Sequence, residues 1–126
     1  GRLHSLNRSP EKARSLADLL QAEAHPLTHF PELPCDILIN TTSVGMHPET
    51  DAMPIPAEAL HGRMTVMDII YNPLQTRLLQ AAQAAGAQTI DGVSMFVYQG
   101  AMQFELWTGK TAPVDLMKTT VYEALQ

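Results

Sequence analysis

Apolar residues fall into short runs that alternate with stretches of helical spacing along the chain. Four runs predict β-strands, because each is mostly apolar and all four end in a polar or glycine-bearing turn. These runs are residues 3–7, 36–40, 64–70 and 87–90. The run at 64–70 is apolar at nearly every position, which predicts a central strand covered on both faces of a parallel sheet.

Helical spacing predicts four helices between and after these strands. They cover about residues 10–25, 74–85, 93–108 and 113–125. Ser9 is suited to the N-cap of the first helix and Pro10 to its first helical position, and Gly86 terminates the second helix. Strands that alternate with helices at this spacing predict one α/β domain with a doubly wound parallel sheet, followed by two C-terminal helices.

Composition narrows the function classes. The chain has 126 residues, of which 45% are hydrophobic and 17% charged, enough for one buried core. A net charge of -5 without a basic stripe argues against nucleic-acid binding, and the apolar runs are too short to span a membrane. Cys35 is the only cysteine, so no intramolecular disulfide forms, which favours the reducing cytoplasm.

The histidines do not predict a metal site. His25 and His29 have the four-residue spacing of ligands on one helix face, but Pro26 lies between them. No third ligand is evident beside them in the sequence. We therefore expect no bound metal and treat both histidines as ordinary polar residues.

The residues directly after each strand are where ligands bind in an open parallel sheet. The first such segment, Asn7-Arg8-Ser9, places a guanidinium beside the positive N-terminus of a helix, with Lys12 one turn further on. An arginine without an acid suits the 2′-phosphate of a dinucleotide. The same residues also fit a capped helix with two solvated cations, and the segment alone leaves both interpretations open.

Two further segments are suited to a ligand. Thr41-Thr42-Ser43 offers hydroxyls after the second strand, although such a turn is common without any ligand. Gly92 allows a flat ring to approach the backbone, and Gln99, two helical turns later, can both donate and accept hydrogen bonds. An exposed helix glutamine is the alternative for Gln99.

Four segments together resemble shikimate dehydrogenase in order and spacing, over essentially the whole chain. They are Asn7-Arg8-Ser9 with Lys12, residues 36–46 (DILINTTSVGM), residues 68–76 (DIIYNPLQT), and Asp91-Gly92 through Gln99 to Gly109. The resemblance implies NADP-dependent interconversion of 3-dehydroshikimate and shikimate, in aromatic amino-acid biosynthesis. It implies a Rossmann-like part at residues 1–91 and helices bordering the substrate cleft at 92–126.

The resemblance also implies roles for individual residues. The residues that it implies for binding the adenosine 2′-phosphate are Asn7, Arg8, Ser9 and Lys12. The residues that it implies along the adenosine ribose and pyrophosphate are Thr41, Thr42 and Ser43. Those beside the nicotinamide are Ile69, Gly92 and Met95, while Tyr71 and Gln99 would reach the substrate.

The family begins with parts that this sequence does not contain. The first strand, glycine-rich loop and helix of the dinucleotide fold are missing, as is the substrate domain that carries a catalytic Lys and Asp. We therefore expect a C-terminal cofactor-binding fragment that holds substrate jointly with an N-terminal domain, contains no catalytic residue, and leaves a dimer open. The alternatives are a quinate/shikimate dehydrogenase and a non-catalytic nucleotide-binding or interaction module.

Overall fold

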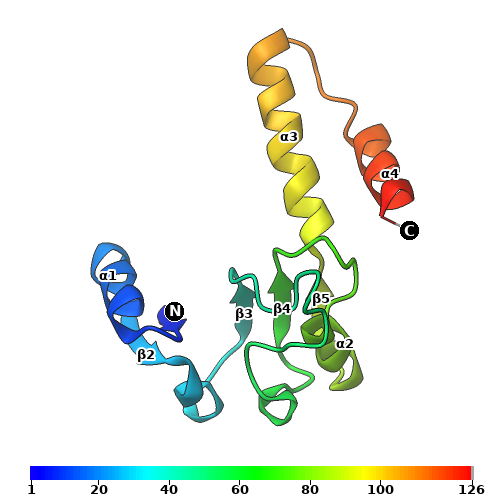
Figure 1. The fold of residues 1–126 in the computed structure, drawn as a ribbon. Helices are drawn as coiled ribbons and strands as arrows, with labels where there is room; N and C mark the ends of the chain where they lie inside the picture. Colours follow the sequence, from blue (N-terminus) through cyan, green and yellow to red (C-terminus); the bar gives the residue numbers. More distant parts are fainter. Residues whose placement is uncertain (126) are drawn as a thin grey trace.

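A computed structural model describes residues 1–125, and Gln126, the end of the predicted domain, lies outside the described residues (Figure 1). The strands are β1 (His4–Asn7), β2 (Glu23–Pro26), β3 (Ile37–Asn40), β4 (Thr65–Asp68) and β5 (Gln88–Ile90). The α-helices are α1 (Pro10–Leu20), α2 (Arg77–Ala84), α3 (Gly92–Thr108) and α4 (Val114–Ala124). Two short 3₁₀ helices, η1 (Leu27–Glu32) and η2 (Ala57–Ala59), lie in the connections.

All strand pairs are parallel, which confirms the predicted α/β class. They form two separate sheets, β1 with β2 and β3-β4-β5, with β4 central in the larger one as predicted. No described strand joins the two sheets, so β1–β2 with α1 stands to one side of β3 in Figure 1. Among the described strands, each sheet therefore has two unpaired edges.

The predicted end of the first helix was wrong. The helix ends at Leu20, because Gln21 adopts the left-handed conformation (φ 54°), and its backbone N–H bonds back to Ala17. Residues 23–26 then form β2, which the sequence pattern missed, in parallel register with β1. Alanine-rich residues at 22–24 are compatible with a helix, and it is the pairing with a strand some twenty residues away that selects the extended conformation.

The other helices begin and end close to the predicted positions. The second starts at Arg77, three residues later than expected, because Thr76 accepts a hydrogen bond from Leu79 N and so acts as the N-cap. Gly109 ends α3 in the left-handed conformation (φ 66°). α4 starts directly after Pro113, as its sequence predicts.

The core lies between β4 and α2. Its buried side chains include Met64, Val66, Leu78 and Leu79, and Phe30 of η1 packs into the same cluster. Along β4 only alternate residues are buried: Thr65 and Met67 stay partly exposed. The prediction that both faces of this strand are covered is therefore wrong for one face, because the described helices pack mainly on the other.

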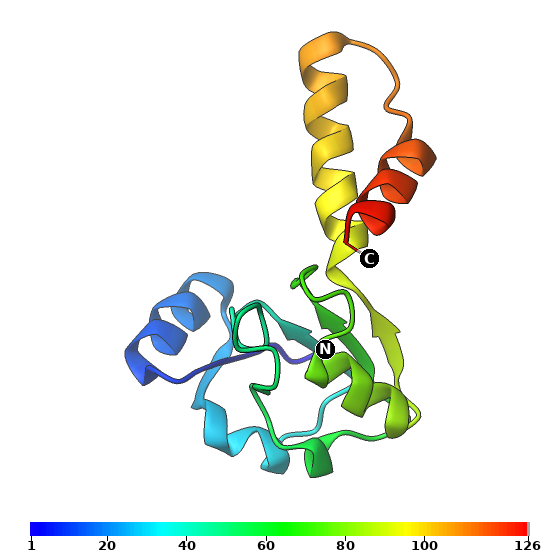
Figure 2. The same ribbon diagram turned by 45° about the vertical axis from the view of Figure 1, so that its right-hand side comes forward.

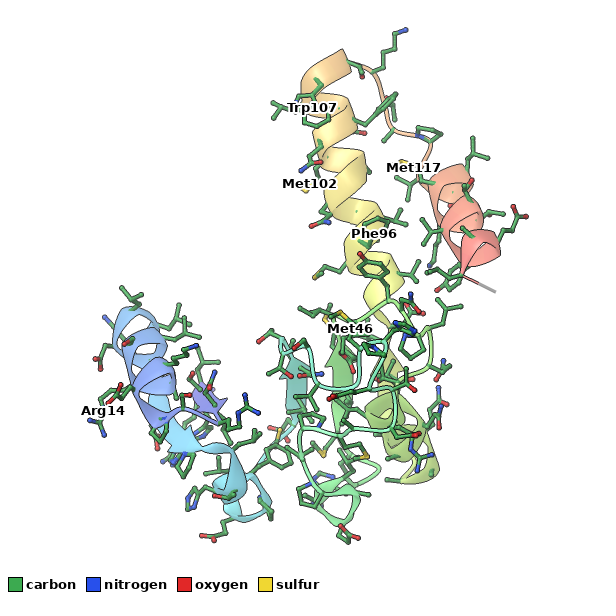
Figure 3. All side chains as sticks on the ribbon, in the orientation of Figure 1. Arg14, Met46, Phe96, Met102, Trp107 and Met117 are labelled. Atoms are coloured by element: carbon green, nitrogen blue, oxygen red, sulfur yellow. The ribbon has the colours of Figure 1, made fainter. Side chains whose placement is uncertain are left out.

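Large apolar side chains remain exposed on several elements, among them β3 and α3. On β3, Ile37 and Ile39 are 67% and 52% exposed. On α3, which projects from the sheet with α4 beside it (Figure 2), Met102 and Trp107 lie on the side away from α4 and are 72% and 77% exposed (Figure 3). Within residues 1–125, no helix combines the length and apolar character needed to cross a membrane.

Candidate functional site

A buried polar network lies at the carboxyl ends of β3 and β4. Asn40 and Asp68 end these strands as register partners and are only 4% and 0% exposed. Asn40 Nδ2 donates to Asp68 Oδ1 (3.1 Å), Thr76 Oγ1 donates to Asp68 Oδ2 (2.8 Å), and Ile70 N donates to Asp68 Oδ1 (3.1 Å). One carboxylate therefore fixes both the segment after β4 and the start of α2.

Asn40 also shapes the hydroxyl-rich turn after β3. Its Oδ1 accepts hydrogen bonds from the backbone N and the Oγ1 of Thr42 (3.1 and 2.8 Å), and Thr42 Oγ1 accepts from Val44 N (3.2 Å). The Thr42 hydroxyl is thus engaged within the turn. Thr41 and Ser43 are exposed at the same edge, so these two side chains are the ones the turn presents outward.

The sequence reasoning did not assign a role to Asn40, Asp68 or Thr76. The available signal was an acid inside an otherwise mostly apolar strand, because a buried carboxylate requires donors close by. Its partners could not be identified from spacing, since Asn40 lies 28 residues from Asp68. Hydrogen bonds among these three residues hold the carboxyl edge of the larger sheet in place, and their side chains are buried rather than open to solvent.

The first turn of α3 packs directly on the end of β4. A Cβ on Gly92 would lie 2.4 Å from the carbonyl oxygens of Ile69 and Ile70, so only glycine fits. The structure therefore gives helix–strand packing as the reason for Gly92, where the sequence suggested room for a ring. Asp91 caps the same helix end by accepting from Val93 N and Ser94 N (3.2 and 3.3 Å).

Four residues predicted for the nicotinamide or substrate surround this junction. Ile69 is partly exposed, Met95 is 36% exposed, and Tyr71 is 40% exposed with its ring stacked on Phe96 at 4.7 Å between centroids. Gln99 is exposed one turn beyond Met95, so the two share a face of α3. Figure 3 shows Phe96 and Met46 close to this base of α3.

The predicted anion segment follows β1, in the smaller of the two sheets. Asn7 Oδ1 accepts from Ser9 N (2.8 Å), which shapes the turn, while Ser9 occupies the N-cap position of α1 without a side-chain capping bond. Arg8 and Lys12 are both exposed. Arg8 lines an open cavity of about 540 Å³, whose other walls are residues 26–28 and 53–56.

Tyr122 ties α4 to the N-terminus of α3. Its hydroxyl donates to Asp91 Oδ2 at 2.7 Å. This hydrogen bond, followed by burial and the negative charge of Asp91, raises the pKa of Tyr122 above its ordinary value. The folded protein therefore holds the phenol proton more tightly than the unfolded chain does, and the contact stabilises the fold below a pH of about 10.

Replacing Tyr122 with phenylalanine is expected to lower the free energy of unfolding by about 1 kcal/mol at neutral pH, because one partly exposed hydrogen bond to a carboxylate is lost. In the parent chain that stabilisation should disappear as the pH rises through the raised pKa. Urea unfolding at neutral and strongly alkaline pH measures both effects. Tyr98→Phe, at a 59% exposed position of α3, is the control; equal stability of Tyr122→Phe and the parent would contradict the assignment.

The parallel strands, the crossover helices and the polar carboxyl edge define a Rossmann-like α/β domain. Residues 92–122 match the model of the shikimate 5′-dehydrogenase C-terminal domain. The chain is 52% identical, over 96% of its length, to shikimate dehydrogenase (NADP(+)) of Methanosarcina mazei. It covers 46% of that relative, so it spans about half the length of the curated relatives it matches.

Solved structures agree with this relationship. Shikimate 5-dehydrogenase from Thermus thermophilus, in complex with NADP(H) and shikimate, superimposes with a TM-score of 0.87 at 35% identity, covering 97% of this chain and 46% of that one. Quinate dehydrogenase from Corynebacterium glutamicum, in complex with NAD, also gives 0.87 but at 28% identity, covering 98% and 46%. The chain belongs to the shikimate dehydrogenase family.

Proposed function

We propose that this chain is the cofactor-binding part of an NADP-dependent oxidoreductase that interconverts 3-dehydroshikimate and shikimate. The observation that carries the proposal is the 52% identity, over 96% of the chain, to a shikimate dehydrogenase (NADP(+)). The complex of the Thermus thermophilus relative with NADP(H) and shikimate supports the same pair of ligands. When bound, NADPH would supply the hydride.

The segment after β1 is proposed to bind the adenosine 2′-phosphate. Arg8 and Lys12 are exposed at the start of α1, where the helix N-terminus adds a positive partial charge. The Asn7–Ser9 hydrogen bond holds the turn that carries Arg8, and Ser9 presents its hydroxyl there without using it to cap the helix. The guanidinium can bind a phosphate with two parallel hydrogen bonds, which a ribose hydroxyl cannot match.

The rest of the edge is proposed to bind the remainder of the cofactor and the substrate. Thr41 and Ser43 are exposed for the ribose and pyrophosphate, and the Asn40 contact keeps the Thr42 backbone in place between them. The nicotinamide would lie against Ile69, Gly92 and Met95. Tyr71, oriented by its stack on Phe96, and the exposed Gln99 would donate to the hydroxyls or carboxylate of shikimate.

We further propose that substrate is held jointly with an N-terminal domain. The two separate sheets suit a further strand between β1 and β3, and that strand would cover part of the exposed surface around Ile37 and Ile39. Met102 and Trp107 provide an apolar face on α3 that a second domain would bury. A cytoplasmic location is supported by Cys35, a free thiol whose pKa is raised by burial, which keeps it unreactive.

The two alternatives are less well supported. A quinate-oxidising enzyme is favoured by the 28% identical quinate dehydrogenase, which was solved with NAD. This chain, however, carries Arg8 where an NAD enzyme benefits from an acid. A non-catalytic module would not need Tyr71 and Gln99 at the base of α3. Neither alternative accounts for the 52% identity, over 96% of the chain, to a shikimate dehydrogenase.

The 126-residue chain alone is expected not to reduce 3-dehydroshikimate. Hydride transfer to a ketone requires a proton donor at the developing alkoxide, and the lysine and aspartate of the family belong to the N-terminal domain. A chimera that joins the N-terminal half of the Methanosarcina mazei relative to this chain should be active. The absorbance of NADPH at increasing 3-dehydroshikimate concentrations measures both.

The isolated N-terminal half is the matched control, and it should be as inactive as the chain alone. Substrate-dependent NADPH oxidation by the chain alone would overturn the assignment of proton transfer to the other domain. A folded chimera that binds NADP but transfers no hydride would instead favour the non-catalytic module.

A further inference from the structure

Three potential metal ligands meet on the β1–β2 sheet, in a cluster that has no part in the proposed function. His4 and Glu23 are the first residues of β1 and β2 and are register partners. His25 follows Glu23 by two positions, and because side chains alternate along a strand, both lie on the same face. Parallel pairing thus brings together two imidazoles and a carboxylate that the sequence separates by up to 21 residues.

The ligand atoms lie close enough to share one ion. His4 Nδ1 lies 3.2 Å from His25 Nε2, and Glu23 Oε2 lies 3.7 Å from His25 Nε2 and 3.9 Å from His4 Nδ1. One ligand atom from each residue can be chosen so that all three lie within 4.8 Å of one another. In a tetrahedral zinc site with Zn–N bonds of about 2.0–2.1 Å, two ligand nitrogens are about 3.3–3.4 Å apart. The observed nitrogen pair therefore nearly has the separation of a tetrahedral edge.

Burial and stacking hold the two imidazoles in place. The His4 and His25 side chains are only 14% and 19% exposed, and His25 stacks on His29 with centroids 5.0 Å apart. Glu32 in turn lies 3.4 Å from His29 Nδ1. Glu23 is 56% exposed, so its carboxylate can move the few tenths of an ångström that metal coordination requires.

We propose that His4, Glu23 and His25 bind a divalent cation of the zinc class, with the fourth coordination position open to water. Two imidazoles and one carboxylate suit zinc and other divalent transition metals with similar ligand preference, whereas magnesium prefers oxygen ligands. The ion would cross-link β1 to β2, the pair of strands that shares no hydrogen bond with the larger sheet. The sequence-based expectation of no metal arose because β1, which supplies His4, lies far from His25 along the chain.

Calorimetric titration of the 126-residue chain with zinc chloride tests this proposal. One zinc per chain is expected, with no comparable binding of magnesium. Glu23→Gln, which keeps the shape of an exposed side chain, should weaken zinc binding more than tenfold. Glu32→Gln is the matched control, because it removes a nearby carboxylate outside the three ligands, and it should leave the affinity unchanged.

Cobalt substitution provides a second readout that a purely structural effect would not produce. Tetrahedral or five-coordinate Co²⁺ should give strong visible absorption in the parent chain, and His4→Gln and His25→Gln should abolish it. If either histidine variant fails to fold by circular dichroism, Glu23→Gln decides alone. Zinc affinity unchanged in Glu23→Gln, or no zinc binding by the parent, would overturn the proposal.

Discussion

Replacing Arg8 with alanine is expected to weaken NADP binding by roughly ten- to a hundredfold and to leave NAD binding almost unchanged. Charge-assisted hydrogen bonds are worth about 1.5 to 3 kcal/mol each, and only NADP offers a phosphate at this position. The structure supports this expectation, because Arg8 is exposed on a turn that the Asn7–Ser9 hydrogen bond holds. Calorimetric titration of both cofactors into the chimera and its Arg8→Ala variant gives the four dissociation constants.

Lys12→Ala is the companion variant. Lysine is a flexible point charge further along α1, so its removal should cost less NADP affinity, and that cost should shrink as salt concentration rises. Arg14→Ala, at an exposed position of the same helix, controls for a general loss of positive charge (Figure 3). Equal losses of NADP and NAD affinity in Arg8→Ala would show that Arg8 supports the turn and does not recognise the phosphate.

Replacing Asp68 with alanine is expected to lower the free energy of unfolding by about 3 to 5 kcal/mol. The carboxylate is fully buried and accepts from Asn40, Ile70 and Thr76, so its removal leaves three donors without this acceptor. The end of β3 and the segment after β4 would lose the carboxylate that holds them together. Urea denaturation followed by circular dichroism measures the loss.

Asp68→Asn separates the hydrogen bonds from the charge. An asparagine oxygen can still accept from Asn40 and Ile70, so this variant should lose about 1 to 2 kcal/mol, mainly through the contact with Thr76. Thr76→Val should remove that same contact and also the N-cap of α2. An Asp68→Ala variant as stable as the parent would contradict the assignment of this network as the anchor of the edge.

The elements that the sequence predicted well are those whose signals are local. The strands at 36–40 and 64–70, the start of α4 after Pro113 and the end of α3 at Gly109 follow from apolar runs, proline and glycine. β2 was missed because residues 23–26 carry no strand signal and become extended by pairing with β1. The incomplete cover of β4 was missed because a continuous apolar run does not say which face a helix will cover.

The same distinction between local and long-range signals applies to the candidate site. Residues 7–9, 41–43 and 91–92 could be singled out because they follow strands, and a parallel sheet places such residues along one edge. The Asn40–Asp68–Thr76 network and the His4–Glu23–His25 cluster could not, since each depends on side chains that come together only across strands. For Gly92 the position was evident, whereas its close contact with Ile69 and Ile70 required the structure.

The steady-state specificity of the chimera tests the central claim most directly. We expect kcat/KM for shikimate oxidation to be at least about tenfold higher with NADP than with NAD, since each 1.4 kcal/mol of differential binding gives a factor of ten. We also expect shikimate to be preferred over quinate. A folded chimera that prefers quinate with NAD, or that oxidises neither substrate while binding NADP, would contradict the claim that this chain is the cofactor-binding part of a shikimate dehydrogenase.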